Sequence, residues 1–166
     1  MCNASGLCDT STLTITVNPV NDAPIATSKT TSTNEDVATS GTVATGVTNV
    51  DGGALTFTQV GTTPSTEGVF TLNPNGTYTF TPANNFNGVV VVTYQVCNAS
   101  GLCDTTTLTI TVNPVNDAPI ATSKTTSTNE DVATSGTVAT GVTNVDGGVL
   151  TFTQVGTTPR CHCGTW

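Results

Sequence analysis

The sequence predicts an all-β fold in which one β-sandwich unit repeats along the chain. Threonine is the commonest residue and valine follows it, and both are β-branched and favour strands. Residues 2–64 recur at 97–159 with a period of 95 residues, and the copies differ only at Ser11/Thr106 and Ala54/Val149. A period of this length is typical of one β-sandwich domain, since helical repeats are shorter.

The sequence VNPVNDAPI stands at residues 17–25 and again at 112–120, and we call these stretches the first and second joint. Each joint contains two prolines, which cannot donate to a β-ladder and which stiffen the connection. The joints divide the chain into the C-terminal strands of a truncated repeat (1–19), one complete repeat (20–115) and the N-terminal part of a third repeat (116–159).

Strands of the complete repeat are expected at 26–33, within 37–47, and at 55–58, 70–72, 78–80, 89–96 and 105–112. Alternating residues flank Asn-Pro-Asn-Gly at 73–76, which is a strong hairpin signal. Phe86 is expected to close one end of the core. The alternation predicts that the following side chains are buried: Leu55, Phe57, Phe70, Leu72, Tyr78, Phe80, Tyr94, Leu108 and Ile110.

The two ends of the chain depart from the repeat. Met1 stands where the repeat has Val96, so we expect the chain to begin inside a repeat, as a gene fragment in which a missing signal peptide says nothing about the parent protein. Residues 160–166 resemble no other stretch, and we interpret them as a frame-slip artefact. Within them, the consecutive residues Cys161-His162-Cys163 are poorly suited to surround one tetrahedral metal ion.

Composition excludes several function classes. The net charge is −8, with three basic residues against eleven acidic ones, so nucleic acid and anionic membranes are poor partners. The longest apolar run, 89–92, is too short to insert in a membrane. The complete repeat has no histidine to activate its hydroxyl groups, and its carboxylates fall in expected loops. We therefore expect no enzyme activity.

The cysteines occur as two Cys-x5-Cys pairs, Cys2 with Cys8 and Cys97 with Cys103. Strand parity places Cys97 and Cys103 on the same side of adjacent strands, where a cross-strand disulfide is possible. Free thiols remain an alternative. A metal site is less favoured, because two cysteines without a histidine fall short of four zinc ligands.

The stretch NGTYTFTP at 75–82, with FNG at 86–88, YQV at 94–96, LTITV at 108–112 and VNDAP at 115–119, resembles the bacterial cadherin-like domain. The resemblance implies immunoglobulin-like or cadherin-like β-sandwich repeats in large adhesins, located outside the cell or on its surface and often associated with calcium. It covers the complete repeat and both partial ones.

Calcium takes six to eight oxygen ligands, and the resemblance directs attention to the carboxylates near the joints. The candidates are Asp117, Glu130, Asp131 and Asp104 at the second joint, and Asp22, Glu35, Asp36 and Asp9 at the first. The alternative is that these residues only make turns. Animal cadherin linkers resemble Asp-x-Asn-Asp, whereas the leading position here is Pro19 or Pro114, which removes a ligand.

Two functions are compatible with these features. The first is a semi-rigid, calcium-stiffened spacer in cell adhesion, whose partners are adjacent repeats of the same chain, cell-surface glycans or other adhesins. The second is a carbohydrate-binding accessory module of a secreted enzyme. Sugar-binding platforms usually present exposed aromatic side chains, whereas those of the complete repeat fall on the apolar faces of strands, which favours the spacer.

Overall fold

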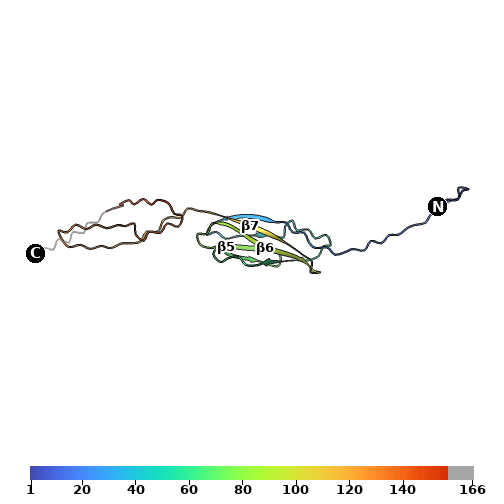
Figure 1. The fold of residues 1–166 in the computed structure, drawn as a ribbon, viewed down its shortest axis with the longest axis horizontal. Coiled ribbons are helices and arrows are strands. Elements are labelled where there is room, and N and C mark those ends of the chain that lie inside the picture. Colours follow the sequence, from blue (N-terminus) through green and yellow to red (C-terminus); the bar gives the residue numbers. More distant parts are fainter. Residues whose placement is uncertain (157–166) are drawn as a thin grey trace.

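A computed structural model describes residues 1–156 and shows an all-β sandwich at the middle of the chain (Figure 1). None of the described residues is helical, so they include no helix that could cross a membrane. The segment before the sandwich and the segment after it leave from opposite ends (Figure 1). The sandwich is built from β1 (Lys29–Asn34), β2 (Thr39–Thr42), β3 (Leu55–Val60), β4 (Gly68–Leu72), β5 (Thr77–Pro82), β6 (Gly88–Asn98) and β7 (Cys103–Asn113).

The strands form two sheets. One has the order β1-β7-β6-β3 and the other β2-β5-β4. All neighbouring pairs are antiparallel except β1 and β7, which run parallel with Lys29 opposite Leu108 and Asn34 opposite Asn113. Because parallel strands end at the same edge of a sheet, the residues that follow β1 lie beside those that follow β7.

The core lies between the sheets and follows the predicted alternation. Six predicted core residues are buried, namely Phe57, Tyr78, Phe80, Tyr94, Leu108 and Ile110. Leu55, Phe70 and Leu72 are only partly buried and pack against this core, because β3 and β4 are edge strands covered from one side. Phe86 is also partly buried against the core. Val43, beyond the end of the short strand β2, is fully buried although the weak local alternation did not single it out.

The predicted hairpin joins β4 to β5. Its turn is closed by hydrogen bonds from the Asn73 N–H to the Thr77 carbonyl (2.8 Å) and from the Gly76 N–H to the Asn73 carbonyl (2.9 Å). The neighbouring rings of Phe70 and Tyr78 stack with centroids 5.5 Å apart. The hairpin is therefore fixed both by its turn and by an aromatic cross-strand contact.

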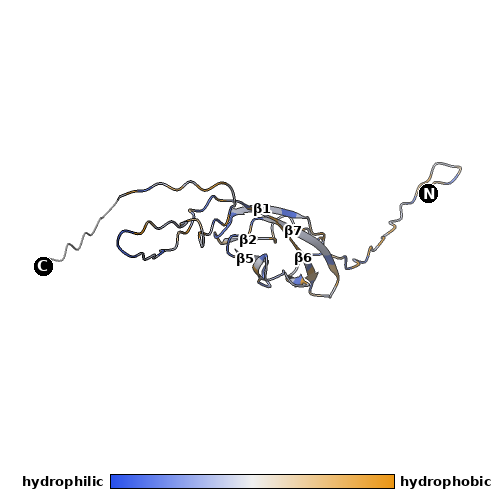
Figure 2. Ribbon diagram, turned by 60° about the vertical axis from the view of Figure 1, so that its left-hand side comes forward, coloured by the Kyte–Doolittle hydropathy of each residue, from blue (hydrophilic) through white to orange (hydrophobic). Residues whose placement is uncertain are grey.

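The repeated sequence forms strands only where its partner strands are present. Leu108, Ile110 and Val112 on β7 are at most 2% exposed, whereas their copies Leu13, Ile15 and Val17 are at least 75% exposed and belong to no strand. These copies lie in the N-terminal segment, where Figure 2 shows apolar residues outside the sandwich. In the segment after the sandwich, the described copies of β1, β2 and β3 are not strands either.

Candidate functional site at the joints

The second joint begins where β1 and β7 end. The Glu35 N–H donates to the Asn113 carbonyl (2.9 Å), and the Glu35 carboxylate accepts a hydrogen bond from the Val115 N–H. Glu35 is only 3% exposed. Because a buried carboxylate is costly unless it is hydrogen-bonded, this contact both satisfies Glu35 and fixes the start of the linker.

Asp117 occupies the middle of this joint. Its N–H donates to Oδ2 of Asp146, in the following repeat, at 2.6 Å. Partial burial raises the pKa of Asp117, and the negative charges of Asp146, Asp36 and Glu35 raise it further. Carboxylates from the complete repeat, the linker and the third repeat therefore lie close enough to repel one another.

Asp36 is held in place by its own contacts. It has a left-handed backbone with φ of 58°, a conformation that aspartate tolerates better than most residues. Its Oδ1 accepts a hydrogen bond from the Asn85 N–H at 3.0 Å. The turn after β1 is thereby tied to the loop before β6.

The first joint holds a second group of polar contacts. The Asp22 N–H donates to Oδ2 of Asp51 at 2.6 Å, which repeats the contact between Asp117 and Asp146. Nδ2 of Asn98 donates to the Asp22 carbonyl at 2.9 Å, and the Ala26 N–H donates to Oδ2 of Asp104 at 2.9 Å. The linker therefore enters the sandwich along the tip of the β6–β7 hairpin.

The structure corrects how the candidate ligands are grouped. Glu35 and Asp36 lie at the second joint, not the first, because β1 runs parallel to β7. Asp104 lies at the first joint, not the second. The Asp9 carboxylate accepts a hydrogen bond from the adjacent Thr10 N–H and lies at neither joint.

Four other acidic residues bear on the candidate calcium sites. Glu130 and Asp131 were predicted at the second joint, but the charges that act on Asp117 are those of other residues. Sequence reasoning missed Asp51 and Asp146, each of which binds the N–H of a joint aspartate. The sequence feature that could have indicated them is the Asp-Gly-Gly turn, which recurs with the same period as the joints.

The carboxylates at the joints fit a metal ion only in part. Within residues 1–156, no group of three or more His, Cys, Asp or Glu side chains is placed to hold a metal as it stands. The donors that gather at the second joint are all oxygen atoms, which suit calcium and do not suit zinc. The chemistry of the donors therefore fits calcium, but the side chains do not form a closed set of ligands.

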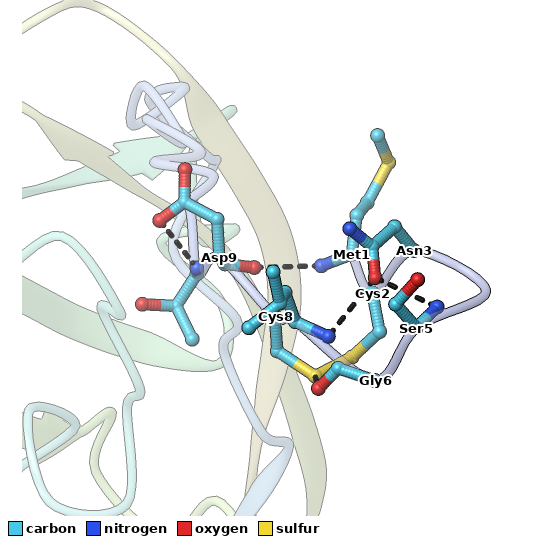
Figure 3. The surroundings of a disulfide bond; sticks show 9 residues. Met1, Cys2, Asn3, Ser5, Gly6, Cys8 and Asp9 are labelled. Atoms are coloured by element: carbon cyan, nitrogen blue, oxygen red, sulfur yellow. Dashed lines mark hydrogen bonds between the residues drawn. A yellow bond between two sulfur atoms is a disulfide. The ribbon is translucent and has the colours of Figure 1, made fainter.

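Both predicted disulfides are present, joining Cys97 to Cys103 and Cys2 to Cys8. Cys97 and Cys103 are the last paired residues of the β6–β7 hairpin. The first bridge closes the same hairpin sequence at the N-terminus (Figure 3). Residues 161–163, whose sequence is poorly suited to bind a metal ion, lie outside the described residues.

The surface of the complete repeat gives little support to other functions. Its aromatic side chains are all buried or partly buried, so it presents no aromatic platform for a sugar. A hollow of about 250 Å³ between β3 and β4 is lined by hydroxyl, amide and apolar groups without an ionisable side chain.

A search of curated proteins finds no match. Among solved structures, the chain is similar to extracellular cadherin domains 1–5 of protocadherin gamma B2, with 20% identity and a TM-score of 0.49 over 69% of this chain and 24% of that one. It is also similar to the endo-fucoidan hydrolase MfFcnA4 of glycoside hydrolase family 107, with 20% identity and a TM-score of 0.45 over 64% of this chain and 17% of that one. The chain thus spans a quarter or less of the length of these two structures.

One protein-family model matches the whole β-sandwich. The model of the bacterial cadherin-like domain matches residues 21–114, more than half of the chain. The matched region runs from the middle of the first joint into the second, and includes all seven strands. This chain belongs to the bacterial cadherin-like domain family.

Proposed function

We propose that this chain is a structural and adhesive segment of a large protein that is secreted or held at the cell surface. Domains of the family are extracellular and lie in tandem. In this proposal residues 1–19, 20–115 and 116–159 belong to three successive repeats, whose first partners are one another. The repeats act as a semi-rigid spacer, and calcium at the joints limits their bending.

One observation carries the calcium proposal. Carboxylates from two successive repeats and from the linker approach one another at the second joint, where desolvation raises the pKa of Asp117 and their repulsion raises it further. A divalent cation would replace this repulsion with attraction to every carboxylate around it. The residues that would hold it are Glu35, Asp36, Asp117 and Asp146.

The first joint and the far end of the third repeat also offer carboxylates to calcium. At the first joint Asp22, Asp51 and Asp104 supply the carboxylates. Glu130 and Asp131 correspond to Glu35 and Asp36 by the repeat period, so they would serve the far end of the third repeat. Weak contacts made by each repeat with another surface would add through multivalency, provided the joints keep the repeats in a fixed spacing.

The proposal is tested by thermal unfolding of the chain in millimolar calcium and in a chelator. An extracellular module of this kind is expected to bind calcium at the millimolar end of the known range. At a concentration about tenfold above the dissociation constant, calcium should raise the melting temperature by on the order of 5 °C. Asp117→Ala should lose most of this gain.

Asp9→Ala is the matched control, because it removes a carboxylate whose hydrogen bond is to the adjacent Thr10 N–H. This variant should keep the full response to calcium, and magnesium should raise the melting temperature less, because it prefers a tight octahedral site. Identical melting curves in calcium and chelator would sink the calcium proposal and leave the joint aspartates with a role in turns only.

A further inference from the structure

We infer that the Cys97–Cys103 disulfide is a clamp on the first joint, which holds the incoming linker at Asp22 and Ala26 and loosens this hold on reduction. The inference concerns residues 22–27 and the tip of the β6–β7 hairpin. The contacts that carry it are hydrogen bonds between these two segments, made by Asn98 and by Asp104, the second of which the proposed function also names as a carboxylate of the first joint.

Two residues that form hydrogen bonds with the linker each directly follow a cysteine of the disulfide. Asn98 follows Cys97, and its Nδ2 donates to the Asp22 carbonyl at 2.9 Å. Asp104 follows Cys103, and its Oδ2 accepts from the Ala26 N–H at 2.9 Å. The disulfide therefore fixes the distance between two of the side chains that bind the linker; another, Asp51, accepts a hydrogen bond from the Asp22 N–H and lies outside this hairpin.

A third contact binds the same segment farther along β6. The hydroxyl group of Tyr94 donates to the Thr27 carbonyl at 3.1 Å. Tyr94 is 1% exposed, and the surrounding core fixes the position of its ring. This contact therefore depends on the sandwich and not on the hairpin tip. The backbone bridge between Ile25 and Thr48 is likewise independent of the tip. Loosening the tip should therefore free the Ala26 amide and the Asp22 carbonyl, and leave Ile25 and Thr27 in place.

Asn98 also closes the hairpin that the disulfide spans. Its Oδ1 accepts hydrogen bonds from the Ser100 and Leu102 N–H groups, both at 3.1 Å. Asn98 is 8% exposed, and it uses both ends of its amide at once. The hydrogen bonds that shape the β6–β7 loop and the one that binds the linker therefore share the Asn98 side chain and form one network.

The first copy of the hairpin shows that this loop does not need the sandwich. Oδ1 of Asn3 accepts from the Ser5 and Leu7 N–H groups at 3.0 Å, as Asn98 does in the second copy (Figure 3). The residues after Cys8 form no strand there. The bridged hairpin is therefore self-contained, and it is the disulfide-closed loop that orients the asparagine.

Reduction would act at the point where the ladder ends. A dithiol donates two electrons and two protons, the bond between the two sulfur atoms breaks, Cys97 and Cys103 become thiols, and the dithiol becomes a disulfide. Because these cysteines are the last pair of the β6–β7 ladder, the tip can then fray without opening the rest of the sheet. Asn98 and Asp104 would lose their fixed spacing.

Amide hydrogen exchange, followed by NMR on the full chain, tests the clamp. In the Cys97→Ser/Cys103→Ser double variant, the Ala26 amide should exchange at least about tenfold faster, while the Tyr78 and Phe80 amides in β5 change by less than about twofold. Dithiothreitol added to the folded wild-type chain should produce the same local change, and reoxidation should reverse it.

Cys2→Ser/Cys8→Ser is the matched control, because it opens an identical hairpin that lies outside the sandwich. It should leave Ala26 unchanged. Two results would overturn the clamp. One is unchanged exchange at Ala26 in the reduced chain, and the other is equal acceleration at Ala26 and in β5, which would show that the disulfide supports only the global stability of the repeat.

Discussion

Phe80→Ala should destabilise the complete repeat by about 3–5 kcal/mol, the usual cost of removing a fully buried phenylalanine. Phe80 lies on β5, the central strand of its sheet, and is 0% exposed. Its removal leaves a cavity that β2 and β4 cannot fill without breaking their ladders to β5. Urea unfolding followed by circular dichroism measures the loss as a lower transition midpoint.

Val91→Ala is the control for this prediction. Val91 lies on β6 in the other sheet, but its side chain is 59% exposed. The substitution should cost less than about 1 kcal/mol, because little apolar area is lost and no cavity forms. Equal losses for Phe80→Ala and Val91→Ala would contradict the placement of the core between the two sheets.

Gly68→Ala should cost about 3 kcal/mol, which combines backbone strain with a steric clash. Gly68 begins β4 with φ of 143°, a value that residues with a side chain rarely adopt. A Cβ atom there would clash with the Thr81 carbonyl oxygen and would lie 2.9 Å from Cα of Pro82. Because the clash is with the backbone of β5, the strand pair itself must move apart.

Gly53→Ala separates the two contributions. Gly53 also has a positive φ, 88°, but a Cβ atom there would meet nothing within 4 Å. This variant should cost only about 1 kcal/mol, the conformational part alone. If the two glycine variants lost the same stability in urea unfolding, the close approach of β4 and β5 would be wrong.

Local patterns in the sequence predicted the strands and the disulfides well. The alternation around residues 73–76 marked the β4–β5 hairpin, and strand parity paired Cys97 with Cys103, because both features depend on residues close together in the chain. Burial was overestimated at Leu55, Phe70 and Leu72, since alternation reports which face a residue occupies and not whether its strand lies at the edge of a sheet.

The grouping of the joint residues could not be obtained in the same way. Glu35 belongs to the second joint only because β1 pairs in parallel with β7, a contact between strands nearly eighty positions apart in sequence. Asp51 and Asp146 acquire their role from hydrogen bonds to Asp22 and Asp117 across 29 residues. Such contacts depend on the pairing of whole strands and loops, which no short pattern records.

In the proposed arrangement, carboxylates of successive repeats share a cation at the second joint. Carboxyl ¹³C resonances, followed by NMR during pH and calcium titrations, report on each of these carboxylates. Without calcium, the pKa of Asp117 should lie above its ordinary value, and calcium should lower it by stabilising the charged form. Asp9 serves as the reference, because its carboxylate contacts only Thr10.

Calcium should shift the resonances of Glu35, Asp36, Asp117 and Asp146 with one common midpoint and leave Asp9 in place. A common midpoint would show that one ion contacts residues from both repeats and from the linker between them. If these four resonances did not respond to calcium, or if each followed a different midpoint, a shared calcium site at the joint would be contradicted.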